Sequence, residues 1–249
     1  MRALAGRALA ALAALLLAAT PAAAQSLNLD LGDGGPGSTA STVLQLMALI
    51  TVLSLAPSIL IMVTSFTRII VVLSFLRGAL GIQQTPPNSV LISLALFLTA
   101  FIMMPTLQTI FDTAIQPLVN EEITELDALQ RASQPVKGFM LEHVREPDLK
   151  LFVDLANNGP IAAPEETPLR ALIPAFMISE LRRAFEIGFL LFLPFVIIDM
   201  VVASILMSMG MLMLPPIMIS LPFKLIFFVL VDGWYLVAGS LVQSYGPAG

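Results

Sequence analysis

The sequence predicts an all-α membrane protein in which two hydrophobic, proline-broken helical hairpins flank a small helical acidic domain. Of the 249 residues, 57% are hydrophobic and only 12% are charged. The mean hydropathy of +0.92 also lies far above the range of soluble domains. In addition, two uncharged stretches are long enough to cross a bilayer, and one polar, acidic segment separates the two hydrophobic parts.

The amino terminus has the three parts of a secretory signal peptide. Two arginines precede an apolar stretch at residues 8–19, and three alanines come before Gln25. The apolar stretch is shorter than the roughly 20 residues that a membrane-spanning helix needs. We therefore expect residues 1–24 to be cleaved. Residues 25–42 are rich in glycine, proline and small polar residues, so we expect a flexible linker there.

Residues 43–111 are predicted to form the first hydrophobic hairpin. Residues 43–63 and 90–111 contain no charged side chain, and their lengths of 21 and 22 residues meet the criterion for membrane-spanning helices. The only charges between them are Arg68 and Arg77. Because positive residues are retained in the cytoplasm, this connection is expected on the cytoplasmic side, in agreement with an exported amino terminus.

Residues 112–172 are predicted to form an acidic domain, which this topology places in the periplasm. Up to residue 170 the segment holds eleven acidic and five basic residues. Its hydrophobic periodicity predicts short amphipathic helices at residues 121–131 and 136–155. The single histidine, His143, lies among charged residues and is interpreted as a surface residue. Loops are expected at 157–160 and 164–168.

Residues 173–249 form the second predicted hydrophobic hairpin, which is interrupted by ionisable residues. A charge at the centre of a membrane costs about 2.5–3.5 kcal/mol on insertion scales, so these side chains should face protein, water or each other. A multi-subunit assembly would provide such surroundings. The ionisable residues are Glu180, Arg182, Arg183, Glu186, Asp199, Lys224 and Asp232.

These charges allow more than one pairing. Helical spacing permits Glu180 to pair with Arg183 and Arg182 to pair with Glu186. Alternatively, one acid meets Lys224 across a subunit boundary, or Lys224 extends to the membrane interface. The remaining side chains expected to be buried and polar are Arg68, Arg77, Asp199 and Asp232. Of these, the two aspartates are also candidates for a proton path.

Prolines within the apolar segments predict broken helices, because each proline removes one backbone donor. The prolines concerned are Pro57, Pro105, Pro194, Pro215, Pro216 and Pro222.

Methionines gather just before the Pro215–Pro216 turn. Met207, Met209, Met211 and Met213 occupy every second position. In an extended loop their thioethers would line one face, and Gly210 would relax the backbone. Flexible thioethers adapt to varied apolar surfaces, so a ring of such loops would form a deformable seal. The alternative is an ordinary apolar hairpin tip.

Several classes of function are disfavoured. The chain has no cysteine and one histidine, which leaves little for a zinc or thiolate site. Its net charge of −5 argues against nucleic acid as a partner. Neither a phosphate-binding loop nor a recognised catalytic motif is present, so we expect no enzyme activity and no cofactor.

Five stretches resemble the FliP family of type III export-gate proteins, which serve bacterial flagella and virulence injectisomes. The resemblance extends from about residue 43 to residue 242. The stretches are TSFTRIIVVLSFLR at 64–77, QTPPN at 84–88, LALFLT at 94–99, PAFMISELRRAFEIGF at 174–189 and LPFVIIDM at 193–200.

The resemblance implies a subunit that forms a ring of five copies and assembles with FliQ and FliR in the inner membrane, within the flagellar basal body. It further implies FlhA and FlhB as neighbours in the export apparatus, FliO as an assembly factor, and unfolded rod, hook and filament proteins as substrates. In this family the methionine loop forms the pore constriction, which corresponds to Met209, Met211 and Met213. A charge pair that bridges subunits corresponds to Glu180 and Lys224. Leu212 interrupts the methionine run that many relatives carry.

Other functions stay open at this point. An injectisome subunit is the first, although the signal peptide and the sizeable acidic domain favour the flagellar branch. The second is an independent proton-coupled carrier in which Asp199 or Asp232 titrates. The third, a membrane-embedded hydrolase, would need His143 as its base and lacks an evident nucleophile.

Overall fold

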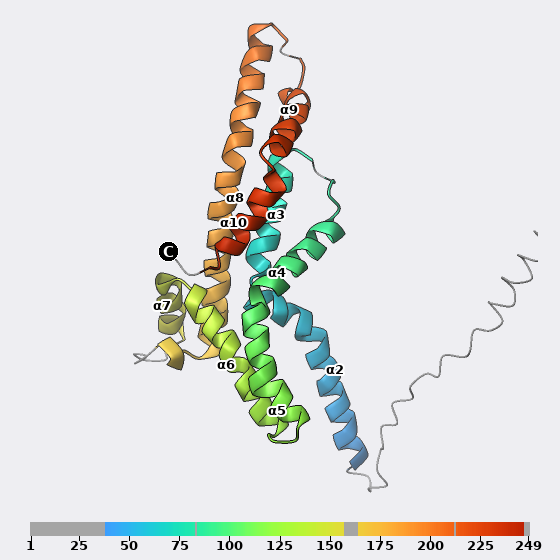
Figure 1. Cartoon of the computed structure of the whole chain (residues 1–249), viewed down its shortest axis with the longest axis vertical. Helices are drawn as coiled ribbons and strands as arrows, with labels where there is room; N and C mark the ends of the chain where they lie inside the picture. The colour runs from blue at the N-terminus through green and yellow to red at the C-terminus, as the bar shows by residue number, and fades with distance from the viewer. Residues whose placement is uncertain (1–37, 83, 157–163, 212, 247–249) are drawn as a thin grey trace, which may run out of the picture. The chain divides into compact units, whose positions relative to one another are not determined.

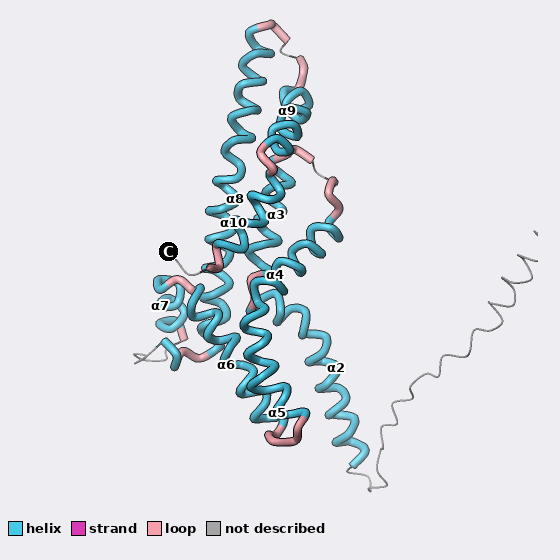
Figure 2. Tube along the Cα trace, in the orientation of Figure 1, coloured by secondary structure: helices cyan, strands magenta, loops and turns pink. Residues whose placement is uncertain are grey.

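The structure, a computed structural model, describes residues 38–82, 84–156, 164–211 and 213–246. All regular secondary structure in these residues is helical, which confirms the predicted class (Figures 1 and 2). The predicted signal peptide lies outside the described residues. So does most of the predicted linker, but its last five residues, 38–42, are helical. The longer helices are α2 (Ser38–Val63), α3 (Phe66–Ala79), α4 (Asn88–Ile110), α6 (Glu125–His143), α7 (Glu146–Leu155), α8 (Leu169–Ser208), α9 (Pro216–Leu230) and α10 (Gly233–Gln243).

The chain divides into two compact units, with the boundary between Ser54 and Leu55. The described part of the first unit is the amino-terminal portion of α2, whose apolar side chains Leu44, Met47 and Leu53 are exposed. All the contacts below lie in the second unit. The boundaries predicted at residues 43, 112 and 173 stay predictions.

Helix α3 lies at the centre of the main hydrophobic core. Its apolar residues recur every three or four positions, so they share one face, and Ile69, Val72 and Leu76 are almost completely buried. This face packs against α8 and α4. The sequence predicted only a short cytoplasmic connection at this place. The packing instead makes it a core helix, and its predicted side of the membrane stays a prediction.

Two helices are long and apolar enough to cross a membrane, and the first of them contains the predicted span 90–111. The first is a continuous stretch over Asn88–Val119, in which the π-helical turn η1 (Phe111–Ile115) joins α4 to the short helix α5 (Gln116–Val119). The second is α8, with 40 residues. Two bent pairs, α9 with α10 and the two parts of α2 on either side of Pro57, raise the number to as many as four.

The prolines inside the long helices do not end them. Helix α4 continues through Pro105, α8 through Pro194 and α9 through Pro222. Each proline removes a single hydrogen bond, while the apolar residues on either side still pack as a helix. The predicted helix ends are therefore wrong at these three positions, whereas the kinks predicted as the alternative stay a prediction. Pro215 and Pro216 do mark a turn, because α9 begins at Pro216, where the missing amide donor costs nothing.

A bend in the carboxy-terminal half lies at Asp232, where no proline stands. Asp232 adopts the left-handed conformation, with φ 50° and ψ 52°, and α9 and α10 meet there at 63°. The next residue, Gly233, is buried, and a Cβ atom on it would lie 2.1 Å from Cε2 of Phe228. Close packing of Phe228 therefore requires glycine at the start of α10.

The acidic segment folds onto the apolar helices. Helix α6 begins after Thr124, whose hydroxyl accepts a hydrogen bond from the amide of Asp127, and it runs through Pro135. Helix α6 therefore combines most of the predicted helix 121–131 with the first part of the predicted helix 136–155, and α7 forms the last part of the latter. The segment packs against α4 and α8 around a second core, formed by Met103, Phe139, Met140, Leu172 and Phe176. Residues 157–160, predicted as a loop, lie outside the described residues. At the other predicted loop, Pro164–Glu166 form a 3-10 turn.

Candidate functional site

A buried ion pair joins α3 to α8. Both side chains, Arg68 and Glu180, are fully inaccessible to solvent. Arg68 Nε donates to Glu180 Oε2 at 2.9 Å, and Nη2 donates to the other carboxylate oxygen, so the guanidinium binds Glu180 through two nitrogens. A charged pair without solvent is tolerated only when its remaining hydrogen-bonding groups find partners. The carboxy-terminal end of the chain supplies those partners.

The residues after α10 close the ion pair. Arg68 Nη1 donates to the carbonyl oxygen of Ser244 at 3.1 Å and to its hydroxyl at 2.9 Å. The hydroxyl of Tyr245 donates to Glu180, and the Tyr245 ring lies 3.7 Å from the guanidinium carbon of Arg68. Ser244 and Tyr245, both distant in sequence, thus provide the remaining hydrogen-bond partners of Arg68 and Glu180.

His143 is part of this cluster, so its interpretation as a surface residue is wrong. It is 7% exposed, its Nδ1 lies 2.8 Å from the carbonyl oxygen of Phe139, and its ring lies 5.0 Å from that of Tyr245. Tyr245 also stacks on Phe139, with ring centroids 5.9 Å apart. Burial, together with the negative charge of Glu180, raises the pKa of Tyr245 above its ordinary value. The phenol therefore stays protonated and remains a donor.

A second ion pair joins α8 to α9. Lys224 Nζ donates to Asp199 Oδ2 at 2.6 Å and to the carbonyl oxygen of Ala79 at 3.1 Å. The other carboxylate oxygen of Asp199 accepts a hydrogen bond of 2.5 Å from the hydroxyl of Ser220. Lys224 is 3% exposed and the Asp199 side chain 33%, so this pair lies nearer the surface than the first. The Ala79 carbonyl belongs to the last turn of α3, where helices leave acceptors unpaired.

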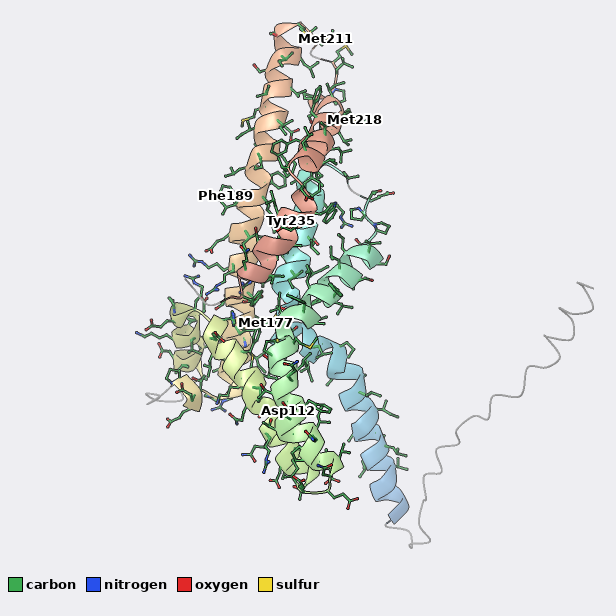
Figure 3. All side chains as sticks on the ribbon, in the orientation of Figure 1. Asp112, Met177, Phe189, Met211, Met218 and Tyr235 are labelled. Carbon is green, nitrogen blue, oxygen red and sulfur yellow. The ribbon has the colours of Figure 1, made fainter. Side chains whose placement is uncertain are left out.

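The methionine segment forms the tip of the α8–α9 hairpin. Helix α8 ends in a left-handed turn at Gly210, φ 74°, where the amide of Met211 bonds to the carbonyl of Leu206. Met207 therefore still belongs to the helix, and the extended four-residue alternation predicted from the sequence does not form. Met209 and Met213 are 61% and 98% exposed. Figure 3 shows Met211 at the same end of the hairpin.

The remaining predicted residues have simpler surroundings. Arg182 pairs with Glu186 at 3.1 Å on the exposed face of α8, which confirms the predicted local pair. Arg77 is partly buried and donates to the side chain of Asn88 at 2.5 Å. Asp232, predicted to be buried, is exposed in this single chain, as an aspartate at a bend between two helices can be.

The pairing observed within the chain differs from the pairing considered from the sequence. Glu180 contacts Arg68 rather than Arg183 or Lys224, and Lys224 contacts Asp199. The predicted bridge between subunits stays a prediction. Sequence reasoning missed the roles of Ser220, Ser244 and Tyr245. The four-residue spacing of Phe139 and His143 was a signal for a shared helix face, whereas nothing local marks Tyr245.

Comparison with known proteins identifies the family. A profile of the FliP family matches residues 49–241, which is more than half of the chain. The chain belongs to the FliP family. The FliP match includes both ion pairs and the methionine tip, and it ends just before Ser244 and Tyr245.

Several FliP proteins are similar along most of their length. The flagellar biosynthetic protein FliP of Caulobacter vibrioides is 60% identical over 237 residues, which cover 95% of this chain and 88% of the relative. The protein of the same name from Bacillus subtilis is 55% identical over 210 residues, covering 84% and 95%. That of Aquifex aeolicus is 53% identical over 213 residues, covering 85% and 89%. The FliP resemblance seen in the sequence motifs is thereby confirmed.

Proposed function

We propose that this protein is a core channel subunit of the flagellar type III protein export gate. In this role it forms, with FliQ and FliR, the pore through which unfolded rod, hook and filament proteins cross the bacterial inner membrane during flagellum assembly. The observation that carries the proposal is the 60% identity to a flagellar biosynthetic FliP over 95% of the chain. FlhA and FlhB are the proposed neighbours in the export apparatus, and FliO the proposed assembly factor.

The exposed surface of the single chain supports a role in a larger assembly. Helices α8 and α9 expose many large apolar side chains, among them Phe189, Met200, Ile205, Met218 and Phe223. Contiguous exposed apolar surface of this kind needs lipid or a protein partner to cover it. Assembly of five copies with FliQ and FliR would cover part of it, and lipid would cover the rest. The acidic segment would then lie on the periplasmic side.

Two sets of residues have proposed roles in this gate. Met209, Met211 and Met213 would form the pore gasket, because their thioethers lie at an exposed hairpin tip and adapt to varied chains. Glu180 and Lys224 would form the charge pair between subunits. Within the chain, Glu180 pairs with Arg68 and Lys224 pairs with Asp199. For the pair between subunits to form, Glu180 and Lys224 must each either leave these partners or bind both at once.

Native mass determination tests the proposal. The detergent-extracted protein is measured alone, then after co-expression with FliQ and FliR. A five-copy ring that captures both partners is the expected result. A stable monomer or dimer that ignores both partners would contradict the proposal and favour a proton-coupled carrier. Capture of injectisome homologues of FliQ and FliR in preference to the flagellar proteins would move the chain to the injectisome branch.

A further inference from the structure

The two arms of the α8–α9 hairpin differ in packing along their length. Near the base, α9 is held in the main core through Phe228, which contacts Phe195 of α8 and Trp234 of α10. Nearer the tip, α8 and α9 face each other across an apolar groove of about 490 Å3. The groove is lined on α8 by residues that include Ile198, Val202 and Leu206, and on α9 by Ile219, Phe223 and Phe227.

A groove between two helices leaves their facing side chains without part of their contacts. Dispersion attraction falls steeply with separation, so few interactions oppose a change in the distance between the two arms in this region. The two arms of the hairpin therefore pack more closely at its base than toward its tip.

The polar contacts between the arms lie beside this groove, on the tip side of Phe195 and Phe228. Among the described residues, Asp199 of α8 contacts two polar side chains of α9, Ser220 and Lys224. At a rise of about 1.5 Å per residue, Asp199 lies about 14 Å along α8 from Ser208, where the helix ends. Figure 3 shows Met211 and Met218 in the part of the hairpin that is nearer the tip.

The same cluster is fixed to a third helix. Lys224 Nζ also donates to the carbonyl oxygen of Ala79 in the last turn of α3. Because α3 is the core helix, this bond ties the cluster to the part of the protein that is most completely buried. Closer to the tip, the described residues form no comparable polar tie to α3, and the large apolar side chains Met200, Ile205 and Ile217 are more than half exposed.

We propose that Asp199, Ser220 and Lys224 form the pivot of the hairpin: a fixed polar point about which the methionine tip moves relative to the core. They act as positioning residues, because their contacts join α8, α9 and α3 and so set the angle at which the two arms diverge. The consequence for gating rests on the proposed function, whereas the pivot itself is a property of the single chain.

Distance measurements between the arms test the pivot. The chain has no cysteine, so Ser204→Cys on α8 and Ile217→Cys on α9 give two unique sites for spin labels. Double electron–electron resonance on the detergent-extracted protein then reports the distribution of distances. We expect Asp199→Asn to widen this distribution by about twofold or more, because the arms populate additional separations. Asp199→Glu should restore most of the original width.

Matched variants separate the pivot from general loosening. Glu186→Gln breaks an exposed ion pair on the same helix and should leave the distribution unchanged. Ser220→Ala removes one hydroxyl and should widen the distribution less than Asp199→Asn does; it replaces that variant if Asp199→Asn does not fold. An unchanged distribution in the folded Asp199 or Ser220 variant would overturn the pivot. So would equal widening by Glu186→Gln.

A second measurement keeps the pivot and the gate distinguishable. In complexes with FliQ and FliR reconstituted into vesicles, Asp199→Asn should raise ion leakage severalfold over the unsubstituted protein. If Asp199→Asn widens the distance distribution but the unsubstituted protein does not assemble with FliQ and FliR, the gate is rejected and the pivot is retained. Unchanged distances with normal assembly would reject the pivot and retain the gate.

Discussion

The base of the protein, which is the buried region around the Arg68–Glu180 ion pair and Phe228, and the tip of the α8–α9 hairpin are stabilised in opposite ways. At the base, the buried charges of Arg68 and Glu180 are met by Ser244 and Tyr245, so directional bonds define one arrangement. At the tip, exposed methionines and aliphatic side chains surround an apolar groove. Non-directional contacts permit several arrangements of similar energy. Contacts within the chain therefore determine the conformation of the base, whereas the conformation of the tip depends on the molecules that surround it.

The strongest test of this contrast is removal of one buried charge. Arg68→Met leaves the carboxylate of Glu180 buried without its counter-ion, which typically costs about 3–5 kcal/mol. We expect a correspondingly large loss of unfolding free energy in detergent. Arg182→Gln, which breaks an exposed pair on α8, the helix that carries Glu180, should cost less than about 1 kcal/mol. Equal losses in the two variants would show that the buried pair is not what stabilises the base.

Removal of one hydroxyl tests the carboxy-terminal contact. Tyr245→Phe keeps the ring over Arg68 but removes the donor to Glu180. A hydrogen bond to a charged group contributes about 1.5–3 kcal/mol, so we expect a destabilisation of that size in chemical unfolding. The control is Tyr235→Phe, since Tyr235 is 74% exposed. If both variants unfold at the same denaturant concentration, Tyr245 does not support the ion pair.

The pH dependence of the stability difference between the unsubstituted protein and Tyr245→Phe provides a separate test. Burial raises the pKa of Tyr245 above its ordinary value of 10.0, so the stabilising contribution is complete below pH 10 and declines as the pH rises further. The stability gap between the unsubstituted protein and Tyr245→Phe should be constant from pH 7 to about pH 9 and shrink above about pH 10. A gap that grows above pH 10 would have the wrong sign for a buried neutral phenol.

A glycine substitution tests how closely the base is packed. In Gly233→Ala the new methyl group meets the ring of Phe228, and overpacking of this kind costs about 1–3 kcal/mol. Gly239→Ala in the same helix meets nothing within 4 Å. It should be neutral or slightly stabilising in thermal unfolding, because alanine favours the helix. Similar melting temperatures for the two variants would mean that α10 moves aside easily.

The smallest effect on stability is expected at the tip. Replacement of Met209, Met211 and Met213 together by alanine should change the unfolding free energy by less than about 0.5 kcal/mol per position, because these side chains are exposed. In the assembled gate, however, the same variant should leak ions. A large fall in melting temperature would show that the tip packs inside the protein. Retained sealing would count against the gasket.

Local patterns predicted most of the helices, because hydrophobic content and periodicity are properties of short segments. They could not predict which side chains meet. Arg68 and Glu180 are separated by 112 positions, and Tyr245 reaches both from the end of the chain. His143 stands among charged neighbours in sequence, and only its four-residue spacing from Phe139 indicated the face on which it is buried. Proline chemistry predicted breaks that packing overrides, whereas the break at Asp232 depends on the aromatic neighbour of Gly233.

Helix α3 connects the two ion pairs. Arg68, in its first turn, binds Glu180, and Ala79, its last residue, accepts the bond from Lys224. Eleven residues of α-helix hold these points about 16 Å apart. Helix α3 is therefore a rigid connection between the two ion pairs, with one polar contact at each of its ends. A displacement of Lys224 is thereby coupled through α3 to Arg68, and so to the carboxy-terminal residues that bind Arg68.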